Sequence, residues 1–153
     1  MDKTIYKSSK KDKIYSLSKL KVGDTWNVGE WKVRVDSVEL FNKNKVDLEK
    51  YKGSQFDEFI KITYSYESIN GEENYELQPE LTNVIDEKNI SGSNYNINTL
   101  KENYKKNSNT PNKEKHIDIY ALKNKSNKIK VSFMLFDENE KSHVSEFDCT
   151  INK

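Results

Sequence analysis

The sequence has one cysteine, two histidines and five glycines among its 153 residues. The single cysteine, Cys149, excludes an internal disulfide and a zinc site built from several cysteines. His116 and His143 lack the close spacing of a paired metal-binding motif, so we predict no metal and no cofactor. The few glycines form no phosphate-binding loop and no nucleophile elbow. We therefore predict that the protein is not an enzyme.

Arginine is almost missing as well: Arg34 is the only one among 26 basic residues. This preference for lysine, together with many asparagines, points to an AT-rich bacterial genome. The 25 acidic residues nearly cancel the basic ones and leave a net charge of +1. Recognition of DNA or RNA relies on arginine and on a basic surface. We therefore predict that the chain does not bind nucleic acid.

Long hydrophobic runs are absent, which excludes a transmembrane segment within the chain. Hydrophobic residues make up 33% and the mean hydropathy is −0.98. Disorder normally combines such low hydrophobicity with high net charge, and here the charges cancel. We predict a single folded domain over residues 14–153, preceded by a flexible, lysine- and serine-rich arm over residues 1–13. Met1 as the native start would mean a cytoplasmic protein, whereas a signal removed upstream would mean an extracytoplasmic one.

Segments in which apolar and polar residues alternate are the dominant pattern of the sequence. This period of two predicts β-strands, because successive side chains of a strand point to opposite faces. Short polar turns separate the segments, so we predict an all-β, antiparallel β-sandwich of about seven to nine strands. The segments that carry the pattern are Trp31 to Val35, Phe59 to Ser68, Asn74 to Leu81, His116 to Leu122, Ile129 to Phe136 and Val144 to Ile151.

The large apolar side chains should fill the space between the two sheets. Trp26 and Trp31 are expected inside, because each indole buries about 150–250 Å², although a ligand platform is the alternative. Cys149 shares the inward parity of Phe147 and Ile151 and is expected to be an unreactive core residue. Along "HIDIYAL", the isoleucines and the alanine lie on one side.

Three connections carry specific expectations. Asn70-Gly71 is a strong turn signal and predicts a hairpin into "NYELQPEL". Pro79 cannot donate a ladder hydrogen bond, so that strand should lie at an edge or end there. The stretch "DENEKSHVSEFD" is similar to a calcium loop, but Lys141 stands at a ligand position and would repel the ion. We interpret it as a hairpin connection.

Asp86 to Lys115 forms a long polar insert, and loops of this length are often functional. A short helical turn is expected near Thr99 to Lys105. Tyr95 and Tyr104 lie in this insert, and we predict that they are exposed ligand-binding residues.

The segment "LKVGDTWNVGEWKVRVDSVEL" resembles the opening of a bacterial immunoglobulin-like domain family, and "FDEFIKITYSY" resembles its next strand. Family members are mostly secreted proteins and lipoproteins of Gram-positive bacteria with unassigned function, and their fold is similar to that of a secreted mycobacterial antigen. Asp86, Gly92 and Tyr95 match the Asp, Gly and Tyr expected after the fourth strand. The resemblance implies an immunoglobulin-like sandwich, an extracytoplasmic location and no catalytic residue.

These observations lead to two functional expectations. The first is a non-catalytic, extracytoplasmic binding or interaction domain of a bacterial surface or secreted protein, with contacts from the loops and the insert. The alternative is a carbohydrate-binding module that uses exposed tyrosines. The expected partner is another protein or a cell-surface glycan, and an unpaired edge strand could join copies of the chain.

Overall fold

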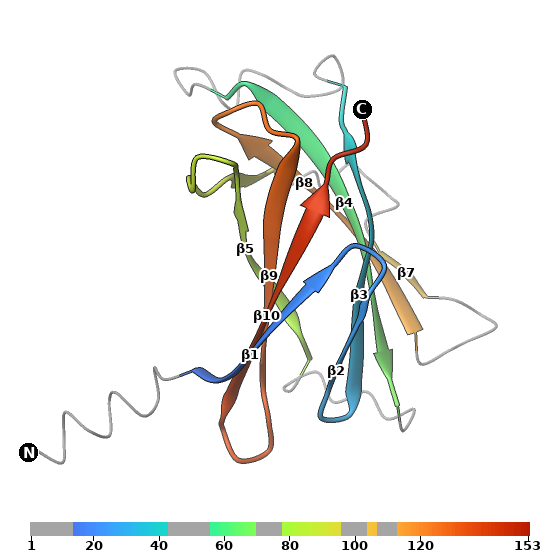
Figure 1. The fold of residues 1–153 in the computed structure, drawn as a ribbon. Helices are drawn as coiled ribbons and strands as arrows, with labels where there is room; N and C mark the ends of the chain where they lie inside the picture. The colour runs from blue at the N-terminus through green and yellow to red at the C-terminus, as the bar shows by residue number, and fades with distance from the viewer. Residues whose placement is uncertain (1–13, 43–55, 70–77, 96–103, 107–112) are drawn as a thin grey trace, which may run out of the picture.

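The computed structural model describes residues 14–42, 56–69, 78–95, 104–106 and 113–153. Within these ranges the chain forms ten strands and no helix (Figure 1). The predicted flexible arm, residues 1–13, lies outside the described residues. The strands are β1 (Ile14–Lys21), β2 (Thr25–Val28), β3 (Trp31–Leu40), β4 (Glu58–Ser68), β5 (Glu80–Ile85), β6 (Ser93–Tyr95), β7 (Tyr104–Lys106), β8 (Lys113–Leu122), β9 (Lys128–Phe136) and β10 (Ser142–Thr150).

The strands form two sheets that face each other (Figure 1). Sheet A has the order β1-β10-β9-β5. Sheet B has the order β2-β3-β4-β8-β6, and β7 also pairs with β8. All pairs are antiparallel except β1 and β10, which run parallel. The predicted all-β sandwich is confirmed, and eight of the strands, those of four or more residues, fall within the expected number.

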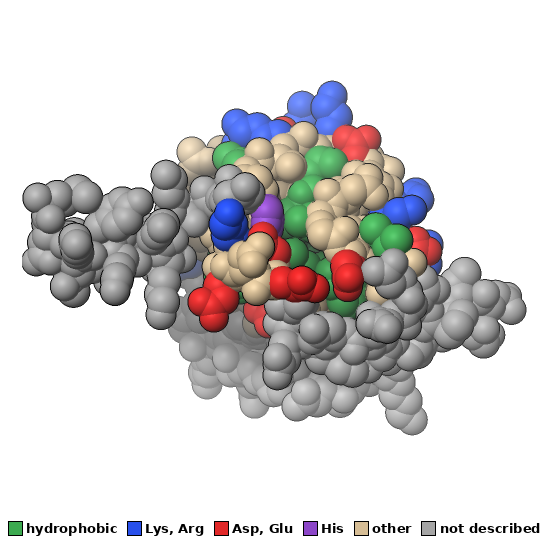
Figure 2. Space-filling view, turned by 90° about the horizontal axis from the view of Figure 1, so that it is seen from below, with side chains coloured by type: hydrophobic (Ala, Val, Ile, Leu, Met, Phe, Trp, Pro, Cys, Tyr) green, Lys and Arg blue, Asp and Glu red, His purple; other side chains and the backbone are tan. Residues whose placement is uncertain are grey.

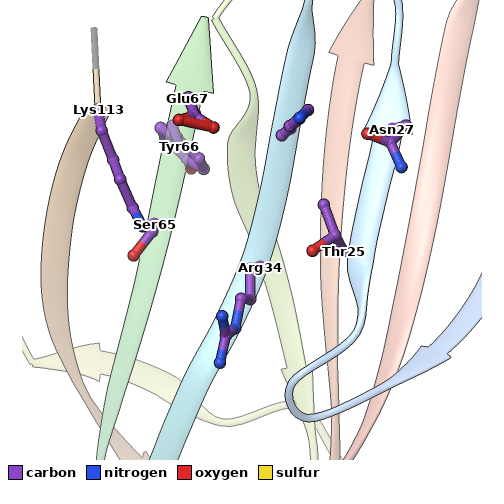
Figure 3. A pocket seen from close by; sticks show the side chains of 8 residues that line it. Thr25, Asn27, Arg34, Ser65, Tyr66, Glu67 and Lys113 are labelled. Atoms are coloured by element: carbon purple, nitrogen blue, oxygen red, sulfur yellow. The ribbon is translucent and has the colours of Figure 1, made fainter. Parts of the chain in front are cut away.

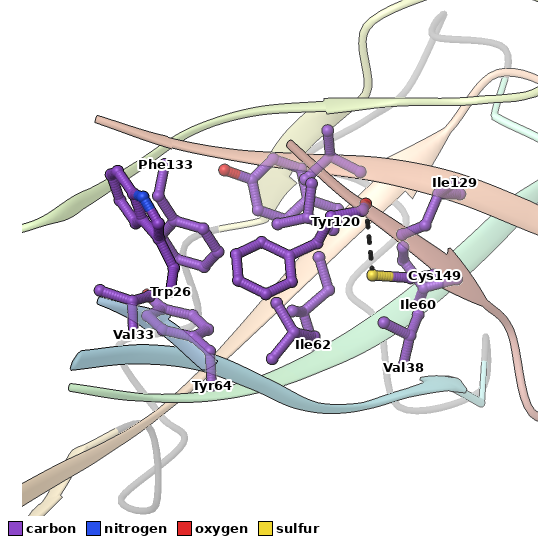
Figure 4. Packing of buried hydrophobic residues seen from close by; sticks show 14 of the residues in the cluster. Trp26, Val33, Val38, Ile60, Ile62, Tyr64, Tyr120, Ile129, Phe133 and Cys149 are labelled. Carbon is purple, nitrogen blue, oxygen red and sulfur yellow. Dashed lines mark hydrogen bonds between the residues drawn. The ribbon is translucent and has the colours of Figure 1, made fainter. Parts of the chain in front are cut away.

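The space between the sheets is filled as the alternation predicts. Trp26 and Trp31 are 4% and 6% exposed, so the predicted packing of both indoles is confirmed. Phe133 of β9 is fully buried, and its ring lies edge-on to the rings of Tyr64, Tyr66 and Phe147. Figure 4 shows Trp26, Tyr64 and Phe133 close together between the sheets. Burial of such apolar area is the main stabilising contribution to the fold.

The predicted connections are partly confirmed. Pro79 directly precedes β5, which lies at the edge of sheet A as expected, because proline lacks the donor that a central strand needs. The residues 137–141 join β9 to β10 as a hairpin connection, also as expected. The predicted hairpin of Asn70-Gly71 with "NYELQPEL" is wrong for the described part of that segment. β5 pairs with β9 in sheet A, whereas β4 belongs to sheet B, and residues 70–77 lie outside the described residues.

A second, small cluster covers part of the outer face of sheet B and corrects the expectation for Tyr95. It contains Phe59, Tyr95, Ile119 and Ala121. Tyr95 is only 5% exposed, and its ring packs edge-on against Phe59. The expectation that Tyr95 is exposed is therefore wrong. The apolar side of "HIDIYAL" faces this outer cluster, because the alternate residues of β8 already point into the main core.

Asp86 and Gly92, two of the residues named in the family resemblance, have structural roles in the turn after β5. Asp86 is 3% exposed, and its carboxylate accepts hydrogen bonds from the backbone N–H groups of Lys88 and Ile90 and from Asn124 Nδ2. Gly92 follows, and a Cβ there would lie 2.9 Å from the backbone oxygen of Ala121. Only glycine allows this close approach.

The polar insert is shorter than predicted, because β6 and β7 lie within it and pair with β8. The helical turn expected near Thr99 to Lys105 is wrong at its end, since Tyr104–Lys106 is a strand. Residues 99–103 lie outside the described residues.

Cys149 lies in the main core with 1% exposure. Burial, reinforced by the nearby charge of Asp148, raises the pKa of its thiol to about 12. Since the thiolate is the reactive form, the folded protein should resist a disulfide reagent such as DTNB at pH 8 and react fully once urea unfolds it. Fast, stoichiometric labelling of the folded protein would contradict this burial.

Candidate functional site

A hollow of about 300 Å³ lies at one end of the sandwich, between two hairpin turns that belong to different sheets. We call it the end hollow. The β2–β3 turn borders one side and the β9–β10 turn borders the other, at the lower end of the molecule in Figure 1. Its lining consists of Gly29, Glu30, Trp31, Leu135, Phe136, Asp137, Glu138 and Asn139. Binding hollows for single side chains or small ligands begin at about this size.

The two turns have defined backbone geometry. Gly29 is the first central residue of the two-residue β2–β3 turn and has a φ of 55°, the position at which a type II′ turn takes glycine. In the β9–β10 turn, Asp137 Oδ1 accepts hydrogen bonds from the N–H groups of Asn139 (2.8 Å) and Lys141 (3.0 Å). Both sides of the end hollow are therefore preformed rather than loose loops.

The end hollow combines an apolar floor with an acidic border. Trp31 and Leu135 form the buried floor, and Phe136 is 46% exposed beside them. Ile69, which donates its backbone N–H to Glu30, is 50% exposed at the same end. The hydrogen bond from His143 and those from the turn hold the pKa of Asp137 below its usual range. Figure 2 shows this end, with hydrophobic side chains visible between carboxylates.

Neither tyrosine that was predicted to bind ligand lines the end hollow. Tyr95 is buried in the outer cluster, and the backbone of Tyr104 pairs with His116 in β7–β8. Sequence reasoning missed Glu30, Phe136 and Glu138. Phe136 was the one sequence signal for this site. It lies at the end of β9 on the face opposite the buried residues, where an apolar side chain is unexpected.

A line of hydrogen bonds joins Ser16, His143 and Asp137. Ser16 Oγ lies 2.7 Å from His143 Nδ1, and His143 Nε2 lies 2.8 Å from Asp137 Oδ2. A serine-hydrolase triad uses the opposite nitrogens, with serine at Nε2 and aspartate at Nδ1. Ser16 also lies outside the lining of the end hollow. The line connects β1 to the β9–β10 turn, and we interpret it as a structural tie.

The inner face of β8 carries three ionisable residues in a row. Glu114, His116 and Asp118 lie opposite Tyr66, Tyr64 and Ile62 of β4, on the face that points toward sheet A. The Tyr64 hydroxyl donates to Asp118 Oδ2 at 2.7 Å, and the His116 ring stacks on Tyr64 at 5.3 Å. Gln78 Nε2 donates to Glu114 Oε2 at 3.0 Å. These polar groups satisfy one another at the β5 side of the core, and they lie outside the lining of the end hollow.

Asp118 should weaken the fold at neutral pH. Burial raises the pKa of Asp118, although the hydrogen bond from Tyr64 and the proximity of His116 oppose the rise. A raised native pKa contributes stability below the unfolded value, about 4, and this contribution is lost as pH rises through the native pKa. We expect Asp118→Asn to raise Tm at pH 7 by roughly 2–4 °C, the change that about 1 kcal/mol gives in a domain of this size.

The amide introduced by Asp118→Asn would still offer an oxygen to Tyr64, so thermal unfolding should show no advantage of this variant at pH 3. Asp118→Ala, which removes the acceptor, is the control and should not gain stability. An equal gain of Asp118→Asn at pH 3 and pH 7 would contradict the titration argument.

The described residues give no further indication of chemistry. Among them, no group of three or more His, Cys, Asp or Glu side chains is arranged to hold a metal ion. No helix in the same part of the chain is long and apolar enough to cross a membrane. A scan against protein-family models, a search of curated proteins and a search of solved structures found no match. The family resemblance of the sequence therefore stays a prediction.

Proposed function

We propose that this protein is a non-catalytic, immunoglobulin-like binding domain that captures a basic segment of a partner protein at the end hollow. The observation that carries the proposal is an apolar hollow, with a half-exposed phenylalanine, bordered by three carboxylates. None of the described residues that line it is basic. Lysine or arginine side chains beside an apolar anchor would complement both features.

The strand order supports the immunoglobulin-like part of the proposal. Constant-type immunoglobulin domains have strands A-B-E-D in one sheet and C-F-G in the other. Here β3-β4-β8-β6 follow the first order and β5-β9-β10 follow the second, with the strands taken in the same sequence along the chain. In this comparison, the β9–β10 turn corresponds to the F–G loop, one of the loops with which variable domains bind antigen. The comparison concerns topology, so the binding argument depends on the hollow itself.

The size of the end hollow suggests how a partner would bind. About 300 Å³ accommodates one large side chain, which would cover Phe136 and reach toward Trp31. Covering the exposed half of Phe136 contributes roughly 0.7–1.5 kcal/mol, or about three- to tenfold in affinity. The carboxylates of Glu30 and Glu138 would attract the flanking basic groups, and salt would weaken this attraction.

Selection of peptides from a random display library tests the proposal. We expect the enriched peptides to carry a large apolar residue flanked by lysine or arginine. Their affinity should fall about three- to tenfold in Phe136→Ser, and it should also fall in Glu138→Lys and with rising salt. Ile90→Ser is the matched control, because Ile90 is 41% exposed and lies in the turn between β5 and β6, away from the end hollow.

Three results would overturn the proposal. The first is enrichment of peptides without basic residues, and the second is equal weakening by Phe136→Ser and Ile90→Ser. The third is self-association of the chain that Phe136→Ser abolishes, as measured by analytical ultracentrifugation, because the occupant would then be a second copy. Association through an edge strand, for which β1 is available, would instead be insensitive to Phe136→Ser.

The proposed location outside the cytoplasm rests on the sequence resemblance. Protease treatment of intact cells tests it, since an extracytoplasmic protein should be degraded while a cytoplasmic marker survives. The alternative of a carbohydrate-binding module was based on exposed tyrosines, and burial of Tyr95 removes one of the two.

A further inference from the structure

A second hollow, of about 340 Å³, lies on the outer face of sheet B and is independent of the proposed protein-binding site. We call it the sheet-face hollow. Its side chains form two rows across neighbouring strands, because Thr25, Arg34 and Ser65 are in register, as are Asn27, Lys32, Glu67 and Lys113. Figure 3 shows how these side chains project from β2, β3, β4 and β8.

Arg34 is oriented within the sheet-face hollow by an ion pair with Asp36. Its Nε lies 3.4 Å from Asp36 Oδ1. The other oxygen of Asp36 accepts a hydrogen bond from the Ser65 hydroxyl, and Ser65 is 6% exposed. A β-bulge at Asp36 leaves this residue out of the ladder with β4, and bulges often redirect side chains at functional positions. The only arginine of a lysine-rich chain is thus both exposed and oriented.

The charges of the sheet-face hollow favour an anionic ligand. Lys32, Arg34 and Lys113 contribute three positive charges, which Glu67 of the lining and Asp36 beside Arg34 offset in part, so that one net positive charge remains. A guanidinium group binds carboxylate or sulfate oxygens with two parallel hydrogen bonds, which an ammonium group cannot do.

The uncharged groups indicate the rest of the ligand. Thr25 and Asn27 are exposed and can exchange hydrogen bonds with hydroxyl groups. The aromatic residue of the lining, Tyr66, is 4% exposed and points into the core, so its ring is not available to stack on a base. Single-stranded nucleic acids need such exposed rings. Hydroxyl-bearing ligands with negative charges fit better.

We infer that the sheet-face hollow binds an acidic polysaccharide, with Arg34 holding a carboxylate or sulfate group and Thr25 and Asn27 contacting sugar hydroxyls. Titration calorimetry with the full chain tests this inference. Polygalacturonate and dextran sulfate supply the two kinds of anion, and uncharged dextran is the ligand control. We expect binding of at least one acidic polymer and no binding of dextran.

Variants connect the binding to this hollow. Arg34→Gln should weaken the acidic polymer about ten- to a hundredfold, the effect of losing a charge-assisted hydrogen-bond pair. Arg34→Lys keeps the charge but loses the paired hydrogen-bond geometry. Its affinity for the acidic polymer should lie between those of the parent protein and Arg34→Gln. Lys128→Gln removes an exposed charge from sheet A and should bind like the parent.

The inference would be overturned if Arg34→Gln and Lys128→Gln lost affinity equally, because attraction would then be non-specific. Tighter binding of single-stranded oligonucleotides than of the polysaccharides, or no binding of either acidic polymer, would also overturn it. Arg34 is half-exposed, and near-ultraviolet circular dichroism would verify that its variants are folded. Phe136→Ser should leave polysaccharide binding unchanged, so this result and the peptide result can fail separately.

Discussion

Replacing Phe133 by alanine is expected to lower the free energy of unfolding by about 3–5 kcal/mol, the usual cost of removing a buried phenyl ring. The ring is fully buried and contacts Tyr64 and Tyr66 of sheet B as well as Phe147 of its own sheet. Its loss would leave a cavity between the two sheets. Because domains are stable by only about 5–15 kcal/mol, much of the total stability would disappear. Urea denaturation followed by tryptophan fluorescence measures the change.

Phe136 provides a matched control on the same strand. Its side chain is 46% exposed at the end hollow, so Phe136→Ala should cost less than about 1 kcal/mol. Similar losses for the two variants would show that the Phe133 side chain does not lie between the two sheets. A small loss in Phe136→Ala would also show that variants at this position fold, which makes Phe136 suitable for binding tests.

Replacing Asp86 by alanine is expected to cost about 2–4 kcal/mol, because three donors lose a charged acceptor at once. These donors are the N–H groups of Lys88 and Ile90 and the side-chain amide of Asn124. The bond to Asn124 ties the turn after β5 to the turn before β9, and Glu87 strengthens this link by accepting from the N–H groups of Asn127 and Lys128. Thermal and urea unfolding measure the loss.

Asp86→Asn keeps one carbonyl oxygen and should lose about half as much. The pH dependence of stability separates the contribution of the Asp86 charge from that of its hydrogen-bond geometry. Burial acts to raise the pKa of Asp86, but the hydrogen bonds from Asn124, Ile90 and Lys88 outweigh it and hold this pKa below its usual range. The resulting stability is present above the unfolded value, about 4, and is lost as pH falls through the native pKa. Asp86→Asn should lack this acid-sensitive part, and an unchanged profile would contradict the role of the charge.

Alternation along the chain predicted most strands and their buried faces because burial of one face imposes a period of two. It worked for β3 and β4, where one set of residues is clearly more apolar. It failed to identify the inner face of β8. There both faces are partly buried, and the isoleucines belong to the outer cluster while Tyr120 and Leu122 point inward. Periodicity cannot distinguish two buried faces.

The candidate sites were harder to predict, since each collects residues that are distant in sequence. The end hollow combines the β2–β3 turn with the β9–β10 turn, and the hairpin prediction for Asn70-Gly71 would have joined different strands. Tyr95 was expected outside because its neighbours are polar, yet Phe59 and Ile119 cover it. Arg34 stood out by its rarity, but its orientation by Asp36 depends on a bulge that alternation does not reveal.

The parallel pairing of β1 with β10 has a consequence for how the domain acquires its structure. The first and the last strand of the described fold are neighbours, so sheet A cannot be completed until residues 142–150 have been synthesised. Pairings between such distant segments close large loops and slow folding, into the range of about milliseconds to seconds for sandwiches. Until then the edge of β10 that later accepts β1 is open to other extended chains, and the pairing with β1 closes this edge against aggregation.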